Sequence, residues 1–130
     1  MLPYFPDTNI FIRFFLRDHK SHSPQAKKYI DEAKAGKRTL IILPVILIEV
    51  EYVLRKVYKI SRADTHVYML SVVQSNYFTI IDHDIITQVL SLYKKNAGID
   101  FVDIFLHLKA QQAGGEVLSF DTDFKKLIKK

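Results

Sequence analysis

Several acidic residues of this chain are of the type that binds divalent cations, and they occur in four separate stretches. They are Asp7, Glu49, Asp100, Asp103, Asp121 and Asp123. Carboxylate oxygens are preferred ligands of Mg²⁺ and Mn²⁺, and two such ions about 3.5–4 Å apart can activate water and stabilise the leaving oxygen of a phosphodiester. The residues therefore suit metal-dependent hydrolysis, provided that the fold brings them together.

Taken singly, each acidic stretch also has a structural explanation. The triplet Asp7, Thr8 and Asn9 can cap a helix that begins near Ile10, and the DTD of residues 121–123 can form a turn that caps the last helix. Asp100 and Asp103 likewise suit the first turn of a helix. The joint pattern favours a metal site, because several carboxylates at one edge of a sheet repel one another and lose hydration unless a cation compensates.

Turn and capping signals divide the chain into alternating helices and strands. Helices are predicted at 23–36 with Ser23 as N-cap, at 44–57, at 61–73 with Ser61 and Asp64 as a capping box, at 84–98, at 100–115 and, as a turn or helix, within 121–130. Strands are predicted before Asp7 and at 39–43, 77–81 and 116–120. This alternation predicts a parallel sheet covered on both faces, with ligands bound at the carboxyl ends of the strands.

Length and composition bound the remaining possibilities. A chain of 130 residues that is 48% hydrophobic predicts one compact domain over 1–130. It contains no cysteine, which excludes thiolate metal sites and suits a reducing compartment, so we expect a cytoplasmic protein. The longest apolar run is broken by Pro44 and is shorter than the ~20 residues of a membrane span, so no membrane association is expected. A net charge of +5 favours an anionic partner such as nucleic acid.

Four motifs together resemble the PIN-domain ribonucleases, and among them the VapC-like toxins of bacterial and archaeal toxin–antitoxin pairs. They are DTNIFIRFFL, LPVILIEVEYVLRKVYKISR, IDFVDIFLHLKAQQAGG and VLSFDTDF, in the family's order and approximate spacing. The resemblance covers nearly the whole chain. It implies a PIN-like three-layer α/β/α sandwich with a central, mainly parallel sheet.

The resemblance also implies a site and its partners. Asp7, Glu49, Asp103 and Asp121 would be both catalytic residues and ligands of one or two Mg²⁺ or Mn²⁺ ions. The supporting residues would be Thr8, Asn9, Asp100 and Asp123. The expected activity is hydrolysis of RNA, and the expected partners are the RNA substrate, a cognate antitoxin protein and a second copy of the chain in a homodimer.

Other functions use the same residues differently. A housekeeping RNA-processing nuclease would need much the same chemistry, whereas a non-cleaving scaffold that binds RNA or protein would not need the complete acidic set. A phosphatase of the haloacid-dehalogenase type is disfavoured, because it requires a second aspartate two residues after the first, and Asn9 occupies that position.

Helical spacing separates Glu49 from Glu51. The two glutamates fall on opposite flanks of the apolar stripe of Ile46, Val50 and Val53, so only one can face the site. Glu49 lies nearer the start of the helix and matches the family's glutamate. Glu51 is therefore predicted at the solvent or dimer surface.

Basic residues and one histidine complete the candidates. Arg13, Arg17, Lys56 and the terminal KKLIKK are candidate phosphate contacts, with an ordinary solvated surface as the alternative. His107, four residues after Asp103, is the one histidine expected near the cleft, and we predict a surface or supporting position for it.

Overall fold

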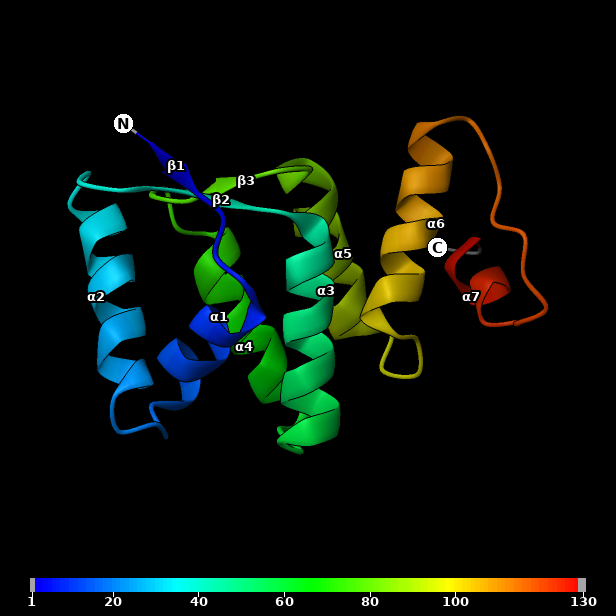
Figure 1. Cartoon of the computed structure of the whole chain (residues 1–130). Coiled ribbons are helices and arrows are strands. Elements are labelled where there is room, and N and C mark those ends of the chain that lie inside the picture. The colour runs from blue at the N-terminus through cyan, green and yellow to red at the C-terminus, as the bar shows by residue number, and fades with distance from the viewer. Residues whose placement is uncertain (1, 129–130) are drawn as a thin grey trace. The chain divides into compact units, whose positions relative to one another are not determined.

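The computed structural model describes residues 2–128, and its chain divides into two compact units. Unit 1 comprises residues 1–82 and unit 2 comprises residues 83–130. Figure 1 shows the helices and strands of both units. In the described part of the chain, no helix combines the length and the apolar character that crossing a membrane requires.

Unit 1 contains a parallel sheet of three strands in the order β1-β2-β3. The strands are β1 (Pro3–Tyr4), β2 (Thr39–Ile42) and β3 (Thr79–Ile80). Strand β1 pairs with β2 at Tyr4 opposite Leu40, and β2 pairs with β3 at Ile42 opposite Ile80. In β2, the side chains of Leu40 and Ile42 are buried, as the apolar pattern of residues 39–43 predicts. The strands run across the top of unit 1 in Figure 1, with helices leading downward from them.

Helix α1 (Thr8–Leu16) follows β1 and begins at the acidic triplet. A side-chain oxygen of Asp7 accepts a hydrogen bond from the backbone N–H of Ile10 at 3.3 Å, so Asp7 is the N-cap. The helix ends at Arg17, which adopts a left-handed conformation with φ of 52°. Phe11 and Phe15 fix its buried side, since Phe11 meets Phe78 edge to face and Phe15 stacks on Tyr68.

Helix α2 (His22–Lys34) begins earlier than the sequence predicts: its N-cap residue is Ser21, and the side chain that accepts the first N–H groups is a histidine. The Nδ1 atom of His19 accepts hydrogen bonds from the backbone N–H groups of Ser21 and His22 at 3.3 and 2.9 Å. Ser23, the predicted N-cap, instead accepts a hydrogen bond from the N–H of His19 at 3.1 Å. The prediction of Ser23 as N-cap was wrong because an imidazole nitrogen upstream satisfies the first N–H groups of the helix.

Helix α3 (Pro44–Tyr52) follows β2 and continues into a single π-helical segment, η1 (Val53–Val57). Pro44 occupies the first helical turn, where its missing N–H costs nothing. Helix α4 (Arg62–Val73) then begins at Ser61, whose hydroxyl accepts the N–H of Asp64 at 3.0 Å. The predicted capping role of Ser61 is therefore confirmed. The buried apolar residues of unit 1 are Phe11, Ile12, Ala26, Ile30, Ala33, Leu40, Ile42, Leu47, Val50, Leu54, Met69, Val72, Val73 and Ile80.

Unit 2 consists of α5 (His83–Lys95), α6 (Phe101–Gln112) and α7 (Phe124–Ile128). Helices α5 and α6 pack together, and the rings of Tyr93 and Phe101 meet edge to face with centroids 5.7 Å apart. Helix α7 packs against α6 and confirms the helix predicted within 121–130, although residues 129 and 130 lie outside the described residues.

The strand predicted at 116–120 does not form. These residues have no regular secondary structure, and Leu118 and Phe120 are fully exposed. A strand needs a neighbour that satisfies its backbone groups, and no described strand pairs with this segment. The β-branched and aromatic residues in this segment favour a strand only where a neighbouring strand is available to pair with it.

The histidine cap of α2 gives the first testable prediction. His19→Ala should lower the free energy of unfolding by about 1 kcal/mol, the usual cost of losing an N-cap acceptor. His19→Asn should retain most of the stability, because the amide oxygen takes the position of Nδ1. Urea unfolding of both variants measures this, with His22→Ala as the control for the lost stacking of the two imidazoles. Equal destabilisation by Asn and Ala would contradict the capping role.

Candidate active site

Asp7 lies at the start of α1, and its side chain is exposed. The next two residues, Thr8 and Asn9, differ in their burial. Thr8 is buried, and its hydroxyl oxygen has no hydrogen-bond partner among the described residues. Asn9 is exposed and, with Asp7, lines a hollow of 360 Å³ between α1 and α2. The capping bond fixes Asp7 through one oxygen, which leaves the other oxygen free to bind a ligand.

A second hollow of 530 Å³ also includes Asp7 in its lining, together with three aromatic residues. Its lining includes Tyr4, Tyr29 and Arg38, and the guanidinium of Arg38 lies over both rings, at 4.5 Å from Tyr4 and 4.9 Å from Tyr29. Arg38 also pairs with Glu32 at 3.1 Å. Sequence reasoning missed this cluster, because only the pairing of β1 with β2 brings Tyr4 close to Arg38.

Glu49 and Glu51 differ in their surroundings on α3. Glu49 is exposed and so can reach a ligand, whereas Glu51 is only 8% exposed and pairs with Arg55 at 3.5 Å. The prediction that Glu51 lies at the solvent or dimer surface was therefore wrong. Helical spacing assigned it to a flank of the apolar stripe, but the turn formed by η1 places the Arg55 guanidinium where it can neutralise a buried carboxylate.

The late aspartates surround the first turn of α6 in unit 2. Asp100 occupies the N-cap position, yet its side chain makes no capping hydrogen bond, and Asp103 lies within the first turn. Asp121 accepts the N–H of Asp123 at 2.9 Å, which is the turn predicted for DTD, and Asp123 pairs with Lys126 at 3.3 Å. The carboxylate of Asp100 is thus available to bind a ligand.

The other three late aspartates act on Asp103. Burial raises the pKa of Asp103, and the charges of Asp100, Asp121 and Asp123 raise the pKa further. Within unit 2, the late acids therefore lie close enough for three of them to act on Asp103, whereas the convergence of all the candidate acids on one site stays a prediction. Among residues 2–128, however, no three acidic or histidine side chains lie close enough to hold one metal ion as they stand.

His107 and the basic residues complete the comparison with the sequence. His107 is buried rather than at the surface, and it lines a hollow of 320 Å³ between α6 and Phe124. Arg13 pairs with Asp18 at 3.1 Å, whereas Arg17 and Lys56 are exposed. Of the terminal basic run, Lys126 pairs with Asp123, and residues 129 and 130 lie outside the described residues.

Comparison with known proteins identifies the family. The model of the PIN domain matches residues 4–130, and the chain belongs to the PIN domain family. The chain is also similar to a protein described as a VapC ribonuclease from Aquifex aeolicus (strain VF5), with 27% identity over 122 residues. That alignment covers 93% of this chain and 89% of the relative. The family match and the parallel sheet with its helices confirm the predicted three-layer α/β/α class.

The raised pKa of Asp103 predicts a cost in stability that the protein accepts when no metal is present. Ionising Asp103 is harder in the folded than in the unfolded chain, so stability falls as pH rises from about 3.8 through the raised pKa. Asp103→Asn should therefore raise Tm at pH 7 in EDTA by roughly 2 °C, the shift that about 0.5 kcal/mol produces in a small domain.

Thermal melting at several pH values measures this difference. The gain from Asp103→Asn should shrink as pH falls through the raised pKa and vanish below about 3.8, where the carboxyl group is protonated in both states. Adding Mg²⁺ should raise the Tm of the wild type more than that of the variant. A lower Tm for the variant at pH 7 in EDTA would show that the carboxylate stabilises the fold instead.

Proposed function

We propose that the protein is a metal-dependent endoribonuclease that hydrolyses RNA phosphodiester bonds and acts as the toxin of a toxin–antitoxin pair. One observation carries the proposal most: a chain that matches the PIN domain over residues 4–130 places Asp103 at the start of α6 near three further aspartates, whose charges raise its pKa together with burial. The similarity to a protein described as a VapC ribonuclease supports RNA as the substrate.

The donor set fits Mg²⁺ or Mn²⁺. The candidate ligands are carboxylates, and these hard oxygen ligands suit both ions. A cation near Asp103 would offset the burial and the neighbouring charges that raise its pKa. Within the described residues, no three acidic or histidine side chains are close enough to coordinate one ion. Binding of a metal ion would therefore draw the carboxylates together.

The ligands that we propose are Asp7, Glu49, Asp103 and Asp121. Asp7 and Glu49 belong to unit 1, and the two late aspartates belong to unit 2. One or two ions would be bound. The supporting residues that we propose are Thr8, Asn9, Asp100 and Asp123.

The chain's own groups would orient the reactants. Asp7 is held by the N–H of Ile10, which limits its side chain to one arrangement. Asp100, free of a capping bond, can accept a hydrogen bond from the attacking water, and Glu49 can do so or help to hold a second ion. When bound, the metal would activate that water and stabilise the leaving oxygen as the P–O bond breaks.

The partners that we propose follow from the same assignment. The net charge of +5 suits an RNA substrate, and we place the reaction in the cytoplasm. Helix α3 exposes Val45 and Tyr52, at 61% and 58%, which gives a protein partner apolar surface to cover. A cognate antitoxin and a second copy of the chain in a homodimer are the protein partners that we propose.

Cleavage of single-stranded RNA should require Mg²⁺ or Mn²⁺ and should stop when EDTA is added. Asp103→Asn should abolish cleavage while the protein stays folded, because the amide keeps the shape of the side chain and removes the charge of a ligand. Gel analysis of labelled RNA together with thermal melting measures both effects.

RNA cleavage by a metal-free preparation would contradict the metal dependence. Wild-type turnover by a folded Asp103→Asn variant would show that Asp103 is not a ligand needed for cleavage. Expression in cells separates the toxin from its alternatives. A toxin should arrest growth and its Asp103→Asn variant should not, whereas a housekeeping processing nuclease or a non-cleaving scaffold should leave growth unaffected.

Glu49 and Glu51 provide a matched pair of variants on one helix. Glu49→Gln should lower the cleavage rate at least about tenfold, as expected for a metal ligand or its orienting partner, with little change in stability. Glu51→Gln should leave cleavage by the folded protein nearly unchanged. It should lower the free energy of unfolding by about 1–3 kcal/mol, because it weakens a buried pair with Arg55.

Single-turnover rates at saturating Mg²⁺, with urea unfolding of each variant, give the comparison. The opposite pattern, an inactive but stable Glu51 variant beside an active Glu49 variant, would reverse the assignment of the two glutamates.

A further inference from the structure

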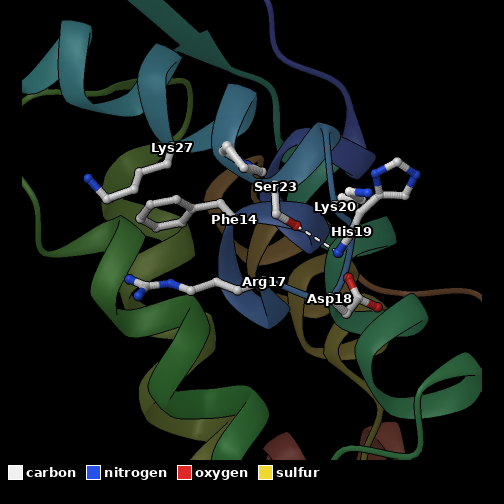
Figure 2. A pocket seen from close by; sticks show the side chains of 8 residues that line it. Phe14, Arg17, Asp18, His19, Lys20, Ser23 and Lys27 are labelled. Carbon is white, nitrogen blue, oxygen red and sulfur yellow. Dashed lines mark hydrogen bonds between the residues drawn. The ribbon is translucent and has the colours of Figure 1, made fainter.

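A hollow of 510 Å³ lies at the corner between α1 and α2, away from the residues proposed for catalysis. Its size lies within the range of about 300–1,000 Å³ that is usual for small-ligand sites. Figure 2 shows its lining. The lining residues are Phe14, Arg17, Asp18, His19, Lys20, Ser23, Pro24 and Lys27.

The charge in this hollow is positive and largely uncompensated. Asp18 is already paired with Arg13 at 3.1 Å. Within residues 2–128, no ion pair involves Arg17 or Lys20. Lys27 pairs with Asp31 at 2.6 Å, but both side chains are more than half exposed, so this pair can exchange for another anion at little cost.

Arg17 occupies a backbone conformation that favours glycine. Its φ of 52° costs a non-glycine residue about 1 kcal/mol or more, and glycine or asparagine would close α1 with less strain. The N–H of Arg17 still completes the helix end by donating to the carbonyl of Arg13 at 3.1 Å. The helix dipole favours a basic residue at this end of α1, and no ion pair within the described residues occupies its exposed guanidinium.

Phe14 supplies an aromatic wall beside these cations. In Figure 2 its ring lies between the side chains of Arg17 and Lys27, and all three extend in the same direction. The side chain of Phe14 is only half-buried. A base of single-stranded RNA stacks well on such a ring, and guanidinium and ammonium groups beside it bind phosphate.

We propose that this hollow binds one nucleotide of a single-stranded RNA segment, with the base on Phe14 and the phosphate between Arg17 and Lys27. The inference rests on the proposed ribonuclease function and adds where the substrate is held. Asp7 caps one end of α1 and Arg17 the other, so nine helical residues separate the two positions. The step from Asp7 to Arg17 is ten residues, or about 15 Å along the helix, so the bound nucleotide would lie a short distance along the strand from the cleaved bond.

Equilibrium binding without cleavage tests the proposal. The fluorescence anisotropy of a labelled single-stranded RNA is measured in EDTA at several salt concentrations, for the wild type, Arg17→Gln, Phe14→Leu and the control Lys37→Gln. Lys37 is exposed in the turn after α2 and carries the same charge outside the hollow. Thermal melting checks that each variant is folded.

Each variant has its own expected signature. Arg17→Gln should weaken binding about five- to tenfold and lower the slope of log K against log salt by about 0.7, as expected for one lost phosphate contact on a single strand. Phe14→Leu should weaken binding by at least about fivefold, the lower end of base stacking, and leave the slope unchanged. Lys37→Gln should change binding by less than about twofold.

Cleavage assays in Mg²⁺ keep this inference separate from the proposed function. Arg17→Gln should raise KM and leave kcat unchanged, because the hollow lies outside the reacting centre. Equal effects of Arg17→Gln and Lys37→Gln on RNA binding would overturn the inference even if the protein cleaves RNA. RNA binding that depends on Arg17 and Phe14 would support it even if no cleavage were found.

Discussion

Strand β2 is the element on which unit 1 depends, because among the described strands it alone is hydrogen-bonded on both sides. Its pairing with β1 fixes where the chain turns into α1, and so where Asp7 stands. Its own carboxyl end passes through Pro44 into α3, which carries Glu49. Two acidic residues 42 positions apart in the sequence thus follow neighbouring parallel strands. The sheet, rather than any local preference, relates these two residues.

In unit 2, the main constraint is the repulsion that Asp103 experiences from neighbouring aspartates. Burial and the charges of three neighbouring aspartates raise the pKa of Asp103, so the ionised form of this side chain is unfavourable in the fold. A role in capping α6 does not explain this cluster of acids. Asp100 occupies the N-cap position, but its side chain makes no capping hydrogen bond. Sites that trade stability for binding in this way are common at functional centres. Under the proposed function, a bound cation would offset the same burial and charges that raise the pKa of Asp103.

Helix α1 carries Asp7, a proposed metal ligand, at one end and Arg17, a proposed phosphate contact, at the other. An acidic residue caps its N-terminus and a basic residue ends its C-terminus, which is the arrangement that the helix dipole favours. The charges proposed to act on RNA therefore also stabilise the helix that carries them, apart from the backbone strain at Arg17. Because the helix is rigid, the distance between Asp7 and the hollow at Arg17 is set by its length.

Short-range patterns in the sequence determined much of this protein. The capping pair Ser61 and Asp64, the buried strand β2 and the set of late acids could all be read from neighbouring residues, because helices, caps and turns are made by groups a few positions apart. Tertiary structure decided the features that depend on distant partners. Residues 116–120 have strand-forming side chains but no neighbour among the described strands, and Arg38 meets Tyr4 through strand pairing. Burial, pairing and charge are properties of such distant contacts, and a linear pattern does not contain them.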